Sequence, residues 1–102
     1  MINFLWDKLN GKRLLILGFG KEGQSSIILL SQIMPELHIG IADSNQSVAD
    51  NYLLVNFDKD KLHLGPNYLD SISNYDYILK SPGVSLSNVE IDSHIVISSQ
   101  TS

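Results

Sequence analysis

The stretch LLILGFGKEGQSSIILL, residues 14–30, places an apolar run, a glycine-rich turn and a second apolar segment in immediate succession. Residues 14–17 are all apolar, which is typical of a strand buried on both faces of a parallel sheet. Apolar residues return within residues 23–34 at broad helical spacing, and Pro35 ends that segment. A strand, a glycine turn and a helix in this order favour an α/β fold.

The turn itself has the pattern G-x-G-x-x-G, with glycines at positions 18, 20 and 23. This pattern is informative only between a strand and a helix, and both are predicted here. Gly18 permits a tight turn, Gly20 lets phosphates approach the backbone, and Gly23 lets the helix pack close to the strand. The first N–H groups of the helix and the positive end of its dipole would then face a ligand. The pattern therefore predicts a nucleotide-binding turn; the alternative is a turn kept only for close packing.

The rest of the chain alternates between strand and helix signals. Strands are predicted at residues 37–43, 61–65, 75–80 and 93–99, and short helical segments at residues 44–52 and 67–73. This alternation implies right-handed βαβ crossovers and a mostly parallel sheet of about five strands. The length of 102 residues fits one small domain. We therefore predict a single Rossmann-like, three-layer α/β domain over residues 1–102, with Trp6 as an N-terminal packing anchor.

Three charged side chains bear on the predicted phosphate site. Asp43 ends the second predicted strand, 20 residues after Gly23, where dinucleotide-binding folds place an acid that bonds ribose hydroxyls. The alternative role for Asp43 is to cap the following helix. Lys21 lies inside the turn and would either reach a phosphate or stay solvated. Glu22 would repel a phosphate, so we expect its side chain to point outward.

A second turn, Lys80-Ser81-Pro82-Gly83, follows the strand predicted at residues 75–80. It would lie at the carboxyl edge of the sheet, where α/β proteins bind their ligands. Pro82 fixes its φ angle, and Gly83 permits a positive φ. We expect a rigid turn that faces the first glycine turn, with its backbone and Ser81 holding the other side of a phosphate or sugar. The alternative is an ordinary turn.

The composition excludes several classes of function. The net charge is −4 and Arg13 is the only arginine, so the basic surface that a nucleic-acid partner requires is missing. The chain has no cysteine, hence no disulfide and no thiol nucleophile. His38, His63 and His94 lack metal-ligand spacing, and no catalytic set can be assembled, so we predict no metal site and no catalytic residue. Without a membrane span or a signal peptide, the expected location is the cytoplasm.

Three motifs together indicate a family: GKRLLILGFGKEGQSS (11–26), IGIADSN (39–45) and YILKSPGVS (77–85). In these, the chain resembles the N-terminal domain of the Mur ligases, and within that family the D-glutamate-adding branch. The S-P-G after the fourth predicted strand is the most specific feature, because NAD-binding Rossmann domains seldom show it there. The resemblance implies a domain that binds the UDP part of UDP-N-acetylmuramoyl-L-alanine for peptidoglycan synthesis.

The resemblance also assigns site residues. It implies that the turn from Gly18 to Gly23 takes the diphosphate, with Phe19 near the uracil. Asp43, Ser44 and Asn45 would lie around the uracil end, and Ser81, Pro82 and Gly83 would line the opposite wall. Glu22 stands where many relatives carry Ser or Thr, and Asn45 where some carry a basic residue. Those two departures put a hydroxyl contact and a uracil contact in doubt.

The family's chemistry implies further domains. ATP and Mg²⁺ act in a central ATPase domain with a G-T-N-G-K-[ST] loop, which a C-terminal domain follows. These 102 residues do not contain that loop. We therefore expect an isolated substrate-binding domain that binds neither cofactor, is inactive alone, and works with the remaining ligase domains in cis. Two alternatives stay open: an NAD(H)-sensing regulatory domain, and the cofactor domain of a dehydrogenase.

Overall fold

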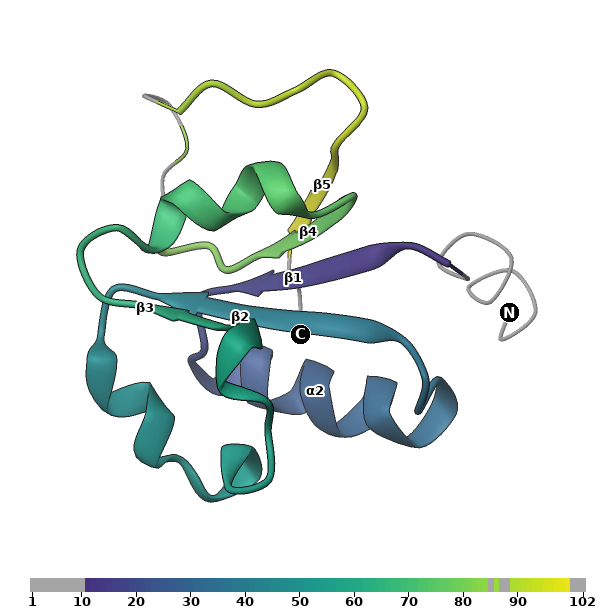
Figure 1. Ribbon diagram of the computed structural model, residues 1–102, viewed down its shortest axis with the longest axis vertical. Coiled ribbons are helices and arrows are strands. Elements are labelled where there is room, and N and C mark those ends of the chain that lie inside the picture. The colour runs from purple at the N-terminus through teal and green to yellow at the C-terminus, as the bar shows by residue number, and fades with distance from the viewer. Residues whose placement is uncertain (1–10, 85, 87–88, 100–102) are drawn as a thin grey trace.

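The computed structural model describes residues 11–84, 86 and 89–99, and Trp6 lies outside these ranges. Its centre is a five-stranded sheet in which every strand pairs in parallel with its neighbours, in the order β3-β2-β1-β4-β5 (Figure 1). The predicted α/β class and its parallel sheet are confirmed. The strands are β1 (Arg13–Leu17), β2 (His38–Asp43), β3 (Leu62–Leu64), β4 (Tyr77–Lys80) and β5 (Val96–Ser99).

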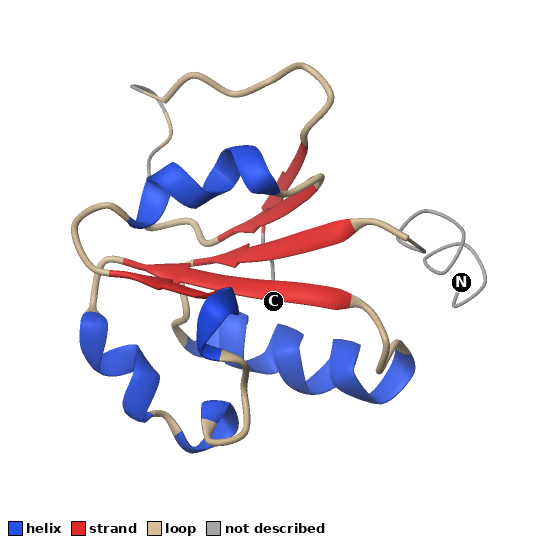
Figure 2. Cartoon of the chain, in the orientation of Figure 1, coloured by secondary structure: helices blue, strands red, loops and turns tan. Residues whose placement is uncertain are grey.

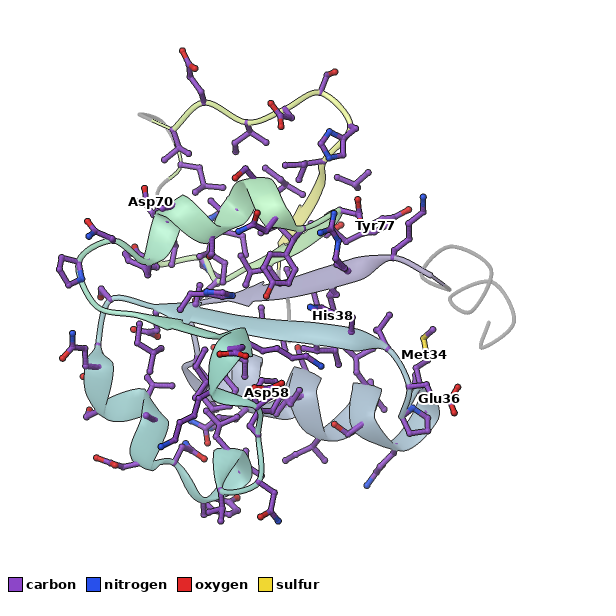
Figure 3. The ribbon with its side chains drawn as sticks, in the orientation of Figure 1. Met34, Glu36, His38, Asp58, Asp70 and Tyr77 are labelled. Atoms are coloured by element: carbon purple, nitrogen blue, oxygen red, sulfur yellow. The ribbon has the colours of Figure 1, made fainter. Side chains whose placement is uncertain are left out.

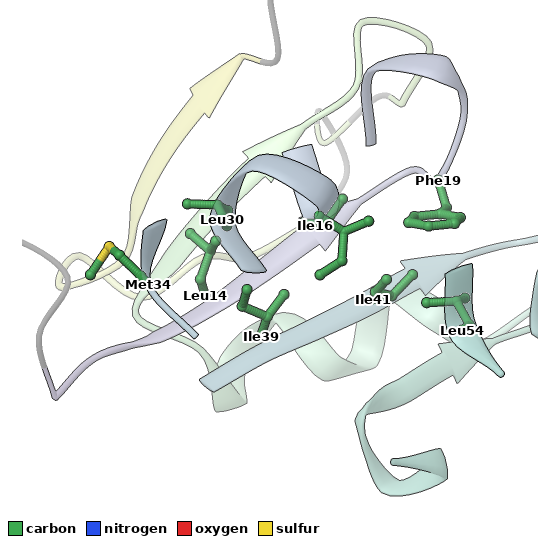
Figure 4. Close-up of a cluster of buried hydrophobic side chains, with 9 residues drawn as sticks. Leu14, Ile16, Phe19, Leu30, Met34, Ile39, Ile41 and Leu54 are labelled. Carbon is green, nitrogen blue, oxygen red and sulfur yellow. The ribbon is translucent and has the colours of Figure 1, made fainter. Parts of the chain in front are cut away.

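Helices lie on both faces of the sheet (Figure 2). In the described ranges, the α-helix is α2 (Lys21–Ile33), and the shorter 3₁₀ helices are η1 (Gln46–Asp50), η2 (Tyr52–Leu54), η3 (Lys59–Lys61) and η4 (Tyr68–Asn74). Two buried clusters show which helix covers which face. One joins α2 and η2 to the sheet, and consists of Leu14, Ile16, Phe19, Ile27, Leu30, Met34, Ile39, Ile41 and Leu54 (Figure 4). The other joins η4 to the opposite face, and consists of Leu15, Leu17, Ala42, Ile72, Tyr75, Ile78 and Ile95.

The apolar run in β1 explains this two-sided core. Successive side chains of a strand point to opposite faces, so Leu14 and Ile16 reach the α2 face while Leu15 and Leu17 reach the η4 face. All four side chains are at most 2% exposed. The position of β1 at the centre of the sheet follows, because only a central strand covered on both faces can bury every side chain.

The strand order creates a switch point beside β1. The chain runs outward from β1 to β2 and β3, and then returns to place β4 on the other side of β1. The carboxyl ends of β1 and β4 meet there, since Leu17 is in register with Lys80. Open α/β sheets bind ligands at the carboxyl ends of their strands where the order reverses. The glycine turn and the S-P-G turn both begin at this point.

Several predicted boundaries differ from the observed ones. The helical segment predicted at 44–52 is split into η1 and η2, because Asn45 and Asn51 each accept a hydrogen bond from the amide two residues later and start separate helices. Strand β4 begins later than predicted, since the Tyr75 amide still donates to Ile72 O at the end of η4. Helix α2 begins at Lys21, two residues before the start predicted at Gly23. The short helix η3 was not predicted from the sequence.

A histidine–tyrosine cluster lies where η4 meets β2 and β3. The Tyr75 ring covers Gly40, where any Cβ atom would overlap the tyrosine hydroxyl. That hydroxyl lies 2.8 Å from Nε2 of His63, and the Tyr75 ring also contacts the ring of His38. Burial lowers the pKa of both imidazoles; nearby Lys61 lowers the pKa of His38 further, and His38 lowers that of His63.

This cluster predicts a stability that falls in mild acid. A lowered pKa means that the unfolded chain takes up protons at a higher pH than the folded chain. Stability is therefore fully present above the ordinary histidine pKa of 6.5 and is lost as the pH falls below it. We expect the free energy of unfolding from urea titrations to decrease between pH 7.5 and 5. His63→Gln should flatten this decrease, whereas His94→Gln, at an exposed position, is the matched control. Identical pH profiles for His63→Gln and the unaltered chain would contradict the assignment.

Candidate functional site

The glycine turn after β1 is shaped by two close contacts. Gly18 has a φ of +93°, which disfavours any other residue, and a Cβ atom there would lie 2.6 Å from Cβ of Ser81. A Cβ atom on Gly23 would lie 2.6 Å from the carbonyl oxygen of Gly18. Gly18 therefore allows contact with the second loop, and Gly23 lets α2 pack onto the turn, as predicted for close packing.

Gly20 differs from the other two glycines of the motif. It is the N-cap of α2, its φ is −81°, and a Cβ atom there would meet nothing within 4 Å. No side chain caps this helix end within the described ranges, and its first amides have no acceptor inside the helix. Lys21 beside it is exposed and Glu22 is half-buried in the first turn. The open space at Gly20 is where the motif predicts a ligand's phosphates.

Asp43 joins the glycine turn to the end of β2. Its Oδ2 accepts a hydrogen bond from the Phe19 amide at 2.8 Å, and its Oδ1 accepts one from the Asn45 amide at 2.9 Å. One carboxylate thus holds the loops that follow β1 and β2. Asn45, not Asp43, caps η1, because its Oδ1 accepts from the Ser47 amide and hydroxyl. The interpretation of Asp43 as the helix cap is wrong.

Phe19 contributes to this region through its backbone. Its side chain is 4% exposed and packs with Ile41 and Leu54 on the α2 face (Figure 4). The ring therefore faces the core, so the expected position of Phe19 near a uracil concerns its main chain and not its ring. Ser44 and Asn45, which follow Asp43, are exposed.

The S-P-G segment forms a four-residue turn against the glycine turn. The Ser81 amide donates to Leu17 O at 2.8 Å, and the Val84 amide donates to Ser81 O at 3.1 Å. Pro82 and Gly83 occupy the exposed centre of the turn. The positive φ predicted as an option for Gly83 is not used, because positive values among the described glycines occur at Gly11, Gly18 and Gly65. The Val84-to-Ser81 hydrogen bond closes the turn without a left-handed residue.

Lys80 is a functional candidate that the motif analysis did not select. Its half-buried side chain folds back onto the turn, and Nζ donates to Ser81 O at 3.1 Å and to Val84 O at 2.8 Å. The available signal was its position, as a charged residue that ends a mostly apolar strand directly before Ser81. Strand alternation alone does not show that such a side chain returns to its own loop.

With this geometry established, comparison with known families is decisive. Residues 12–99 match the model of a family described as the Mur ligase MurD-like, N-terminal domain. The chain belongs to the Mur ligase family. Comparisons with curated proteins and with solved structures gave no match.

Membership confirms the resemblance at the level of the family. As a Mur ligase N-terminal domain, the chain is a substrate-binding domain of a ligase of peptidoglycan synthesis. In the part of the chain that the structure describes, no three His, Asp or Glu side chains are grouped to hold a metal ion. Within the same ranges, no helix is long and apolar enough to cross a membrane.

The predicted site residues of this Mur ligase domain fall into two groups at one edge of the sheet. The first group is held in the two loops by packing or by hydrogen bonds, and comprises Gly18, Phe19, Gly23, Asp43 and Ser81. The exposed group comprises Gly20, Lys21, Ser44, Asn45, Pro82 and Gly83. A separate hollow is lined by Arg13, Met34 and His38 among others and includes none of these residues. It lies at the end of the sheet where β1 and β2 begin, and Figure 3 labels Met34, Glu36 and His38 there.

The glycine contacts predict different costs for the same substitution. Gly18→Ala and Gly23→Ala should each destabilise the domain by about 1–3 kcal/mol, since both introduce a backbone or side-chain clash and Gly18 also has a positive φ. Gly20→Ala should cost less, about 0.5 kcal/mol, because the added Cβ atom meets nothing and only the N-cap preference for Gly over Ala is lost. Urea unfolding of the three variants measures this order. Equal destabilisation at all three positions would contradict the geometry of the turn.

Proposed function

We propose that this chain binds the UDP part of UDP-N-acetylmuramoyl-L-alanine for an ATP-dependent, D-glutamate-adding ligase. The observation that carries the proposal is the close contact between Gly18 and Ser81, which joins the two family motifs at the switch point of the sheet. The diphosphate would lie over the open backbone at Gly20, against the N-terminus of α2. Pro82 and Gly83 would form the opposite wall.

The nucleoside end of this proposal rests on the loop after β2. Ser44 and Asn45 are exposed beside Asp43, and the carboxylate of Asp43 is already bonded to two amides. We propose that the main role of Asp43 is to hold the two loops in place. A contact between its remaining lone pairs and the nucleoside would be an additional, weaker role. This supports the UDP-sugar over NAD(H), because an NAD-binding domain uses the corresponding acid on the ribose.

Electrostatics require the backbone to supply most of the attraction for a diphosphate. Lys21 is the exposed cation of the first turn, and Glu22 beside it is an anion. Glu22 also lies in the first turn of α2, where a carboxylate is stabilised by the helix dipole. The amides at the start of α2 therefore carry the binding, and Glu22 limits its strength.

The catalytic part of the proposed ligase would come from other domains in cis. ATP and Mg²⁺ would bind there, the substrate carboxylate would be phosphorylated, and the amine of D-glutamate would attack the acyl phosphate. This domain would bind neither cofactor and would have no ligase activity alone. The proposed location of the enzyme is the cytoplasm.

Calorimetry with the 102-residue chain tests this proposal. We expect UDP-N-acetylmuramoyl-L-alanine and UDP to bind more tightly than NADH. Gly20→Leu should weaken UDP binding at least about tenfold, which corresponds to ~1.4 kcal/mol, because the side chain fills the space proposed for the phosphates. Thermal unfolding should show that this variant stays folded.

Ser25→Leu is the matched control, since it adds the same side chain at an exposed position of the same helix. It should leave UDP binding unchanged. Tighter binding of NADH than of the UDP-sugar would contradict the proposed substrate. If Gly20→Leu binds UDP with unchanged affinity, the glycine turn serves only close packing and does not bind the phosphates.

A further inference from the structure

Lys80 lies at the point where the two candidate loops meet. It is the last residue of β4 and is in register with Leu17, the residue before Gly18. Leu17 belongs to the buried cluster on the η4 face, and residues paired in register project to the same face. The side chain of Lys80 therefore leaves the sheet on the η4 face. Its ammonium lies against the carbonyl oxygens of Ser81 and Val84 in the S-P-G turn.

Both ends of that turn are bonded to this one ammonium. Ser81 O, which also accepts from the Val84 amide, lies 3.1 Å from Nζ, and Val84 O lies 2.8 Å from it. Hydrogen bonds from an ionised donor are stronger than those between neutral groups. A lysine ammonium has three N–H donors, so these two carbonyls use two of them. The turn is held at its first and last residues by a single cation.

This arrangement matters for a ligand that carries negative charge. Carbonyl oxygens are the negative ends of the peptide dipoles, and an anion is repelled where they face it. The bonds to Lys80 hold both oxygens against the ammonium and place a positive charge beside the turn. The chain has seven basic residues and a net charge of −4, so Lys80 is one of few cations that can add to the attraction of the backbone amides.

We propose that Lys80 is a positioning residue that holds the Ser81–Val84 turn in the orientation that accepts a phosphate group, and that its charge strengthens that contact. This inference rests on the proposed function, because it takes the anion to be the diphosphate of a UDP-sugar. Lys80 acts through the turn and through its charge, without needing to touch the ligand. The role is therefore separable from that of the glycine turn.

The test compares three lysine variants in the 102-residue chain. Lys80→Met removes the donors and the charge while keeping an unbranched apolar stem, and Lys80→Arg keeps both. Lys59→Met, at an exposed position of η3, removes one charge elsewhere and is the matched control. UDP affinity is measured by calorimetry at low and high salt. Hydrogen exchange of the Val84 amide, which donates to Ser81 O, reports the order of the turn.

We expect Lys80→Met to weaken UDP binding at least about tenfold at low salt and to reduce its salt dependence. The Val84 amide should exchange at least about tenfold faster. Lys80→Arg should restore most of the affinity and the protection, and Lys59→Met should change neither. Restoration by Arg and the altered salt dependence would not follow from a general loss of stability. If Lys80→Met does not fold, Lys80→Gln replaces it as the neutral variant.

Unchanged UDP affinity and unchanged Val84 protection in a folded neutral variant would overturn the inference. An equal loss of affinity in Lys59→Met would also overturn it, because the effect would then be one of net charge. If the unaltered chain binds no UDP, the proposed function fails. The Val84 exchange rate still decides in that case whether Lys80 holds the turn.

Discussion

The contact between Gly18 and Ser81 is the constraint on which the candidate site depends. It brings the loop after β1 against the loop after β4, and it is possible only because Gly18 has no Cβ atom and adopts a positive φ. The central place of β1 in the sheet puts this contact at the switch point of the strand order. A longer side chain at Gly18 would separate the two loops, and each would then be an ordinary surface turn.

The charged side chains around this contact mostly hold backbone. Asp43 binds the amides of Phe19 and Asn45, and Lys80 binds the carbonyls of Ser81 and Val84. An anion secures amides and a cation secures carbonyls, so each side chain matches the dipole it fixes. A domain with a net charge of −4 can offer an anionic substrate a favourable site in this way, because ordered amides replace clustered basic side chains.

Most of the fold was predictable because its signals are local. The four apolar residues of β1 imply burial on both faces, and the alternation of strands and helices implies a parallel sheet. Positions in the site that depend on contacts between distant residues were less predictable. The spacing of Asp43 predicted a ribose ligand, with a helix cap as the alternative, but it did not predict the bond to the Phe19 amide 24 residues earlier. The directions of two other side chains likewise depend on tertiary packing. The ring of Phe19 points into the core, and the ammonium of Lys80 folds back onto its own loop.

The central claim is that a diphosphate binds where the loops after β1 and β4 meet. Amide chemical shifts recorded by NMR during a UDP titration test it most directly. The largest shifts should occur at Gly20, Lys21 and Gly83, with little change at Arg13 and His38 in the hollow where β1 and β2 begin. Shifts concentrated at Arg13 and His38, with none at Gly20 and Gly83, would contradict it.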